Sequence, residues 1–148
     1  MGSIILFQSL ESFDIGLRVT SAIVGGSLIG LERLWHHKEA GLKTNTLVCV
    51  GAAIFGMIST NSVFIPNWSA SQFSVGVLTG VGFLGSGIIL QRTEHLQGVN
   101  SAATIWVSAG VGLACGMGQY GLAIISLVAV LFVQIFHRWI ETKVNTRR

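Results

Sequence analysis

Few residues in this sequence are of the types that bind ions or catalyse reactions, and the informative ones lie at the ends of long apolar stretches. Glu32 ends the first stretch, Asn45 begins the second, and Asn100 and Thr104 begin a later one. If these stretches are membrane helices, all four side chains lie at one depth near the inner leaflet. Ionisable groups at membrane depth commonly serve a pathway or a partner. The hypothesis is therefore a polar pocket that opens to the cytoplasm and is formed by Glu32, Arg33, Lys43, Asn45, Asn100 and Thr104.

The same residues have a simpler interpretation that requires no ligand. Asn45 and Asn100 can cap the first turns of helices, and Thr104 can bond to its own backbone. Glu32 can pair with Arg33 or Lys43 at the lipid boundary. The residue types and their spacing leave both interpretations open.

Metal binding and catalysis find little support in these residues. Magnesium prefers six oxygen ligands and keeps several waters, and Glu32 is the weak candidate to contact it. The apolar stretches have no acidic residue at their midpoints, so a dedicated Mg²⁺ path within one copy is poorly supported. A serine hydrolase needs a base near its nucleophile, and the candidates are Ser86 and His137. We therefore expect neither an enzyme nor a cofactor.

Residues 80–85 match the glycine pattern of a dinucleotide-binding loop. That pattern has meaning after a β-strand in a soluble βαβ unit, whereas here it lies inside an apolar stretch. Glycines that recur every four residues let membrane helices approach closely. We therefore predict helix-packing roles for Gly26, Gly30, Gly76, Gly80, Gly82, Gly85, Gly112 and Gly116.

The composition indicates which elements must position these residues. The 148 residues are 51% hydrophobic and 10% charged, whereas about 25% of the residues of a soluble domain are charged. Residues 44–91 and 95–137 contain no Asp, Glu, Lys or Arg, and a membrane helix needs roughly 20 apolar residues. The composition therefore excludes a nucleic-acid-binding protein, a disordered tail and a soluble enzyme.

The apolar stretches predict an all-α membrane protein, a compact bundle of five transmembrane helices. A short periplasmic segment at 1–14 precedes the five-span domain at 15–137, and a basic cytoplasmic tail follows at 138–148. The expected spans are about 15–31, 44–64, 72–90, 101–115 and 121–136.

The cationic residues predict the direction of the chain, because Lys and Arg accumulate on the cytoplasmic side of a membrane. With five spans, Arg18 falls on one side and the other eight of the nine Lys and Arg residues fall on the opposite side. The N-terminus is therefore expected outside and the C-terminus in the cytoplasm, where the cations meet anionic lipid.

Four sequence blocks, in this order, resemble the MgtC/SapB family. They are 30–33 (GLER), 40–48 (AGLKTNTLV), 82–90 (GFLGSGIIL) and 98–106 (GVNSAATIW), and the resemblance covers roughly residues 15–120. Lys43 stands where the family usually has Arg, a change that keeps the charge. Longer members continue into a cytoplasmic C-terminal domain, whereas this sequence ends soon after the last predicted span.

The resemblance implies a multi-pass protein of the bacterial inner membrane that is associated with magnesium limitation, acid stress and survival inside host cells. It implies a regulator of other membrane complexes, including the proton-translocating ATP synthase. The expected partners are lipid and either another membrane protein or a second copy of the chain, with no nucleic acid and with Mg²⁺ only as a weaker expectation. Two alternatives stay open: a small oligomeric Mg²⁺ transporter or channel that uses Glu32, and a scaffold without a ligand.

Overall fold

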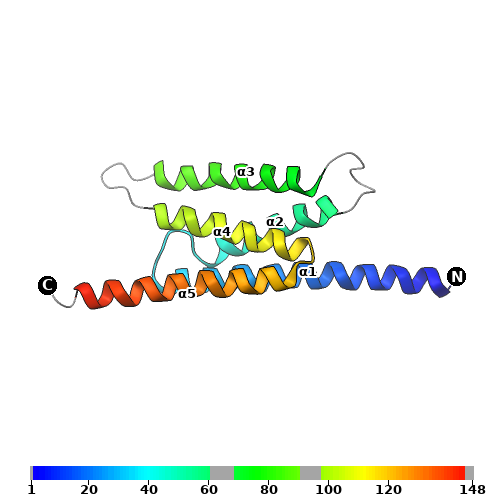
Figure 1. Ribbon diagram of the computed structural model, residues 1–148, viewed down its shortest axis with the longest axis horizontal. Helices are drawn as coiled ribbons and strands as arrows, with labels where there is room; N and C mark the ends of the chain where they lie inside the picture. Colours follow the sequence, from blue (N-terminus) through cyan, green and yellow to red (C-terminus); the bar gives the residue numbers. More distant parts are fainter. Residues whose placement is uncertain (1, 61–68, 91–97, 146–148) are drawn as a thin grey trace.

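The computed structural model describes residues 2–60, 69–90 and 98–145, and the regular structure in these ranges is entirely helical (Figure 1). Each of the five helices contains a stretch that is long and apolar enough to cross a membrane. The prediction of an all-α protein with five spanning helices is therefore confirmed. In chain order they are α1 (Gly2–Trp35), α2 (Leu42–Thr60), α3 (Ala70–Leu90), α4 (Val99–Gly116) and α5 (Tyr120–Asn145).

The first and last helices are longer than the predicted spans. α1 begins at Gly2 rather than near residue 15, and α5 continues to Asn145 rather than ending near residue 136. Charged residues end a stretch that can lie in lipid, but they do not end a helix, because Glu, Lys and Arg are good helix formers. Most of the residues between the predicted spans 44–64, 72–90 and 101–115 lie outside the described ranges. The division of the chain into segments and the direction of its ends stay predictions.

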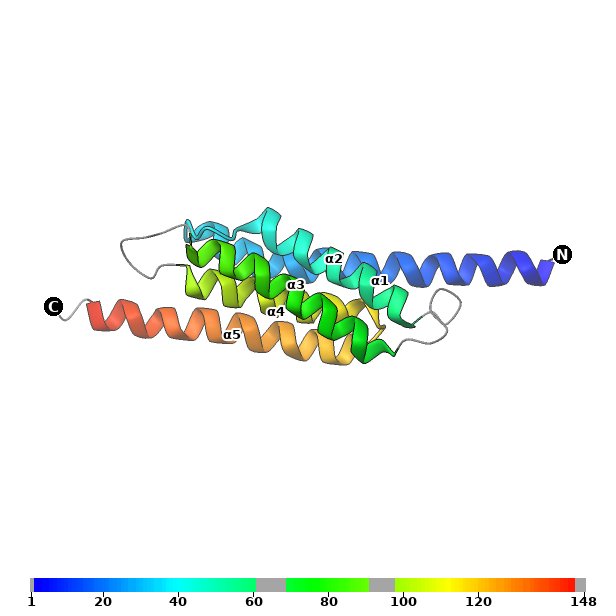
Figure 2. The ribbon, with the colours of Figure 1, turned by 90° about the horizontal axis from the view of Figure 1, so that it is seen from above.

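The helices form three layers (Figures 1 and 2). α3 is one outer layer, α2 and α4 form the middle layer, and α1 and α5 form the other outer layer, where they run parallel to each other. The spanning stretch of α4 is 61% buried, whereas those of α3 and α5 are each 6% buried. α4 is therefore the helix against which the others are positioned.

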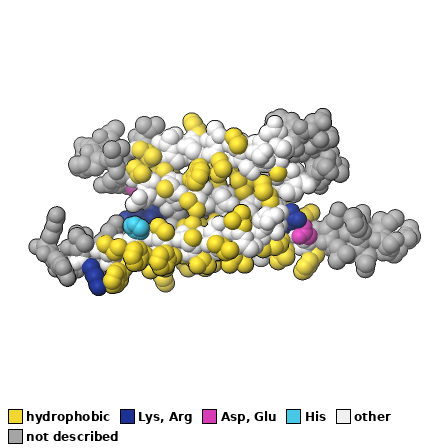
Figure 3. Space-filling view, in the orientation of Figure 1, with side chains coloured by type: hydrophobic (Ala, Val, Ile, Leu, Met, Phe, Trp, Pro, Cys, Tyr) yellow, Lys and Arg dark blue, Asp and Glu magenta, His cyan; other side chains and the backbone are white. Residues whose placement is uncertain are grey.

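The surface of the described part fits a membrane environment. Figure 3 shows hydrophobic side chains over the middle of the molecule and coloured charged side chains near its two ends. Large exposed hydrophobic residues are numerous, among them Phe83 at 77% and Ile125 at 70% exposure. In water such a surface would aggregate, whereas in lipid it needs no cover.

Glycine permits the close crossing of α1 and α2. A Cβ added at Gly26 would lie 2.7 Å from the Cβ of Cys49, and one added at Gly30 would lie 2.6 Å from the Cα of Leu42. Both distances are shorter than real Cβ contacts, so the two backbones approach here because these side chains are absent.

The crossing of α2 and α4 is closer still. A Cβ added at Gly112 would overlap the backbone carbonyl of Cys49, and one added at Gly116 would overlap that of Ala53. Gly85 lies at a looser crossing, where its added Cβ would be 3.3 Å from a side chain of α4. Close packing of α1, α2 and α4 therefore forms the rigid centre of the bundle.

Three of the predicted packing glycines behave differently. A Cβ added at Gly76, Gly80 or Gly82 would meet nothing within 4 Å. The prediction that they pack against another helix is not met within the single chain, because α3 is an outer helix with few buried residues.

Arg18 joins α1 to the turn between α4 and α5. Its Nη1 donates to the carbonyl oxygen of Gly116 over 2.7 Å, and its Nη2 lies 2.7 Å from a carboxylate oxygen of Asp14. The turn contains Gly118 at φ +72°, a conformation that favours glycine. Arg18 thus supplies a hydrogen bond to the exposed end of α4.

Replacing Arg18 with Met should lower the free energy of unfolding by about 1–2 kcal/mol, because a charge-assisted hydrogen bond to the end of α4 is lost. Unfolding of the purified chain in mixed micelles measures the change. Asp14→Asn is the control: its partly exposed ion pair contributes less than about 0.5 kcal/mol, and the bond to Gly116 stays. Equal effects of the two substitutions would contradict this assignment.

Candidate functional site

Polar side chains of α4 gather at the end of the bundle that contains Arg33, which we call the Arg33 end. Ser101, Thr104 and Ser108 are buried on one face of α4, because their spacing of three and four residues matches the helical repeat. Thr104 Oγ1 donates to the carbonyl oxygen of Asn100, one turn earlier, over 2.7 Å. The two serines bond instead to side chains of other helices.

Asn45 is fully buried and joins three parts of the chain. Its Nδ2 donates to the carbonyl oxygens of Ala40 and Gly41, both over 2.9 Å, in the connection between α1 and α2. Its Oδ1 accepts from Ser108 Oγ over 2.9 Å. One amide therefore holds the connection, α2 and α4 together, and its own polar atoms are satisfied as a membrane interior requires.

Arg33 makes a second link between helices at this end. The side chain is buried, with 7% of the residue exposed, and its Nη2 donates to Ser101 Oγ over 2.9 Å. Its carbonyl oxygen accepts from backbone N–H groups of the following turn. Arg33 thus fixes the end of α1 against the start of α4.

Glu32 faces α5 rather than the polar face of α4. Its Oε1 lies 3.6 Å from Arg138 Nη1 and 3.7 Å from His36 Nε2. These distances fit ion pairs, but they are longer than hydrogen bonds. The Glu32 side chain is 14% exposed, and its Oε2 is buried without a hydrogen-bond partner.

The structure brings only part of the predicted pocket together. Arg33, Asn45 and Thr104 are buried at the polar face of α4, whereas Lys43 and Asn100 are exposed. The reason is helical geometry: Lys43 is two residues from Asn45, or about 200° around α2, although both lie at a similar depth. Arg33 bonds to Ser101, Asn45 to Ser108, and Thr104 to the backbone of its own helix, so they form a filled cluster rather than an open pocket.

The described residues contain no group of three or more His, Cys, Asp or Glu side chains that could hold a metal ion. Glu32 lies beside the cationic Arg138 and the imidazole of His36, and the Arg138 charge disfavours a divalent cation at the same carboxylate. The weak expectation that Glu32 contacts Mg²⁺ gains no support from this geometry.

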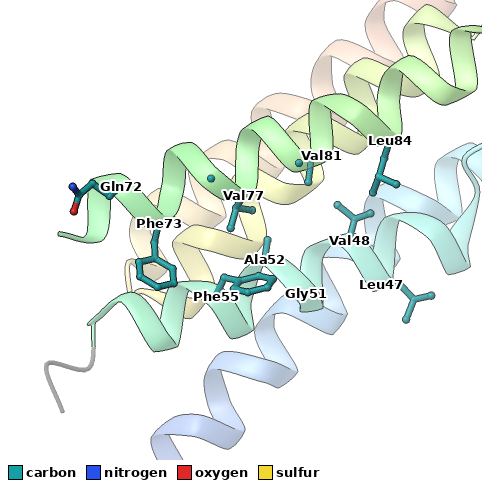
Figure 4. A pocket seen from close by; sticks show the side chains of 12 residues that line it. Leu47, Val48, Gly51, Ala52, Phe55, Gln72, Phe73, Val77, Val81 and Leu84 are labelled. Atoms are coloured by element: carbon teal, nitrogen blue, oxygen red, sulfur yellow. The ribbon is translucent and has the colours of Figure 1, made fainter. Parts of the chain in front are cut away.

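An open groove lies elsewhere, between α2 and α3, and encloses about 650 Å³. Figure 4 shows Phe55 and Phe73 at one end of it and Leu84 towards the other. The side chains along its walls are almost entirely apolar, and Gln72 is the polar exception. Glycines of both helices expose their backbones to the groove, namely Gly51, Gly76 and Gly80.

Sequence reasoning did not assign partners to two residues of the Arg33 end. His36 lies in the turn that follows α1, four residues after Glu32, a spacing at which helical side chains meet, so the spacing alone indicates this pairing. Arg138 was treated as part of the tail, and its contact with Glu32 depends on how α5 packs against α1. The pattern within α5 alone gives no signal for that contact.

Comparison with known proteins places these features in a family. The family model described as "MgtC family" matches residues 19–143, which include all five helices apart from the first part of α1 and the end of α5. The chain belongs to the MgtC family. The resemblance seen in the four sequence blocks is therefore confirmed over nearly the whole chain.

Several curated relatives support this MgtC-family membership. Protein MgtC of Salmonella typhimurium is 40% identical over 139 residues, covering 93% of this chain and 58% of the relative. Protein MgtC of Brucella abortus is 41% identical over 120 residues, covering 81% of this chain and 50% of the relative. A Synechocystis protein described as uncharacterized, slr0014, is 42% identical over 131 residues, covering 87% of this chain and 54% of the relative.

The chain spans about half the length of these curated relatives. No solved structure matches it. Family membership and five helices of spanning length and composition together identify a multi-pass membrane protein of the MgtC type.

Proposed function

We propose that this MgtC-family protein is a regulator of the bacterial inner membrane that binds another membrane protein through the groove between α2 and α3, and that it is not an enzyme. Its role would be linked to magnesium homeostasis and to stress or intracellular survival, as the family resemblance implies.

The groove is the observation that supports this proposal best. Its walls combine apolar side chains with backbone exposed at Gly76 and Gly80, one turn apart on α3. Two glycines four residues apart let a second transmembrane helix approach within backbone contact. Lipid alone does not require such a pair, because flexible acyl chains follow any apolar surface.

A Mg²⁺ transporter or channel fits the described residues less well. At the Arg33 end, Arg33 bonds to Ser101 and Asn45 to Ser108 across helices, and Glu32 is paired with Arg138. An oligomer could still bring several Glu32 carboxylates together. Mg²⁺ flux into liposomes that contain the purified protein, if abolished by Glu32→Gln, would establish transport and reject the regulator.

Photo-crosslinking from inside the groove tests the regulator. A photoreactive amino acid at Phe55 should form an adduct with a second membrane protein in native membranes. Gly80→Leu should reduce this adduct at least about tenfold, because a loss of roughly 1.4 kcal/mol in binding is a tenfold change and the leucine fills the site of helix contact.

Gly82→Leu is the matched control for this experiment. Gly82 lies on the same helix, has equally open surroundings and is not among the residues that line the groove. It should leave the adduct unchanged, and both variants should accumulate normally, because leucine is the better helix former. Equal loss of the adduct in the two variants, or no loss in either, would reject the groove as the binding site.

A further inference from the structure

The parallel helices α1 and α5 contain every buried side-chain polar atom that lacks a hydrogen-bond partner among the described residues. Two of the residues concerned are Glu32 on α1, through its Oε2, and Gln134 on α5, through both its Oε1 and its Nε2. An unpaired polar atom inside a membrane protein is costly. Each such atom needs an explanation, and a second state in which these atoms are paired would supply one.

Helix register places Glu32 and Gln134 at the same depth. α1 contributes Ala22 and Ile29 and α5 contributes Ala123 to one core cluster, against which Val130 of α5 packs, and we call this region the α1–α5 seam. Gln134 lies one turn before Arg138 on the same face of α5, and Arg138 contacts Glu32. The α1 pair and the α5 pair are each seven residues apart, and parallel helices rise at the same rate. Glu32 follows Ile29 by three residues, and Gln134 follows Val130 by four.

The groups that face Glu32 determine what this site can bind. They are Arg33 on α1, His36 in the turn that follows α1, and Arg138 on α5. α4 has no charged residue, and Lys43, the one charged residue of α2, is exposed. The Arg138 side chain is 46% exposed and sits on a helix that continues beyond the seam, so its guanidinium can turn into water without unfolding.

We propose that Glu32 and Gln134 form a proton-binding site in the α1–α5 seam, at which protonation of Glu32 exchanges Arg138 for Gln134 as its partner. A proton taken from water binds Oε2 of Glu32. The new O–H donates to Oε1 of Gln134, and the Gln134 Nε2–H donates to Oε1 of Glu32. This carboxyl–amide pair satisfies all three unpaired atoms of the two residues and releases the Arg138 guanidinium.

Infrared difference spectroscopy of the full chain in liposomes tests the proposal directly. Acidification should produce a carbonyl band of a protonated carboxyl group that disappears in Glu32→Gln. In Gln134→Met the band should shift to higher frequency, because its hydrogen bonds are lost. The pH at the midpoint of protonation should fall by about one unit, since one hydrogen bond favours the protonated form.

Arg138→Gln tests whether Arg138 is the partner that Glu32 gives up on protonation, and it does so at a partly exposed position. The Arg138 charge favours the ionised carboxylate, so its removal should raise the midpoint by about one unit. The titration is repeated in His36→Gln, because an imidazole gains its charge in a neighbouring pH range. Opposite shifts in Gln134→Met and Arg138→Gln are the signature of partner exchange.

Tyr120→Phe is the control, since Tyr120 is also on α5, with a buried unpaired hydroxyl at the far end of the helix. It should leave the band and its midpoint unchanged. The proposal is overturned if Glu32→Gln leaves the acid-induced band intact, or if Arg138→Gln lowers or does not move the midpoint. It is also overturned if a Gln134→Met variant that circular dichroism shows to be folded changes neither the frequency of the carboxyl band nor the pH at the midpoint of protonation. If Gln134→Met does not fold, the results for Glu32→Gln and Arg138→Gln still decide whether the proposal stands.

Discussion

Gly112→Ala should lower the free energy of unfolding by at least about 3 kcal/mol, and the protein should accumulate poorly in membranes. The added methyl group would overlap the backbone carbonyl of Cys49, and a backbone atom cannot rotate away as a side chain can. α2 and α4 would have to separate, which disrupts the most buried contact of the bundle. Unfolding in mixed micelles and immunoblots of membrane fractions measure the two effects.

Gly110→Ala provides a control only two residues away. Gly110 is exposed, and a Cβ added there would meet nothing within 4 Å. This substitution should be neutral or slightly stabilising, because alanine is the better helix former by roughly 1 kcal/mol. Similar stability of the two variants would show that the helices do not cross at Gly112 as described.

Asn45→Leu should destabilise the protein by about 2–3 kcal/mol. The leucine keeps the volume but removes three hydrogen bonds, and it leaves the carbonyl oxygens of the α1–α2 connection and the Ser108 hydroxyl without their partner. Hydrogen bonds between membrane helices average about 0.6 kcal/mol, with an upper value near 1.7. The same unfolding titration measures the sum.

Two single variants, Ser108→Ala and Asn100→Ala, refine the result for Asn45→Leu. Ser108→Ala removes one of the three bonds and should cost about 1 kcal/mol. Asn100→Ala changes an exposed side chain and should stay within about 0.5 kcal/mol of the parent. A larger effect from Asn100 than from Asn45 would mean that the buried amide is not the residue that joins the helices.

The number and type of the helices were predictable from the sequence, but their ends were not. Long uncharged stretches such as 44–91 allow only spanning helices, so α2 and α3 were expected close to where they occur. Charge shows where lipid ends, and a helix can continue past that point into water. The extension of α5 to Asn145 therefore needed three-dimensional information.

The site was predictable only where depth and helical face agree. The spacing of Ser101, Thr104 and Ser108 indicated one face of α4, and all three are buried there. Lys43 is grouped with them by depth alone, and it lies about 200° around α2 from Asn45. Asn100 is four residues before Thr104 on the same face, but it is exposed at the start of α4. A shared level in the membrane does not bring side chains together unless they also face the same neighbour.

The glycines show a second limit of sequence patterns. Gly76 and Gly80 have the same spacing as Gly112 and Gly116. The first pair lines an open groove, whereas the second contacts the backbone of α2. Spacing predicts that a helix can be approached closely, but the identity of the approaching element depends on the arrangement of the whole bundle.

The central position of α4 has a consequence for biogenesis. A ribosome delivers α4 after α3, although α4 bonds to α1 and α2. Until Ser101 and Ser108 emerge, Arg33 lacks its interhelical hydrogen-bond acceptor and the side-chain carbonyl of Asn45 lacks its donor. Exposing these polar groups to acyl chains is costly. We therefore expect the first hairpin of the nascent chain to stay beside the insertion machinery while α3 passes, and a chain halted before α4 to leave Arg33 without its hydrogen bond to Ser101.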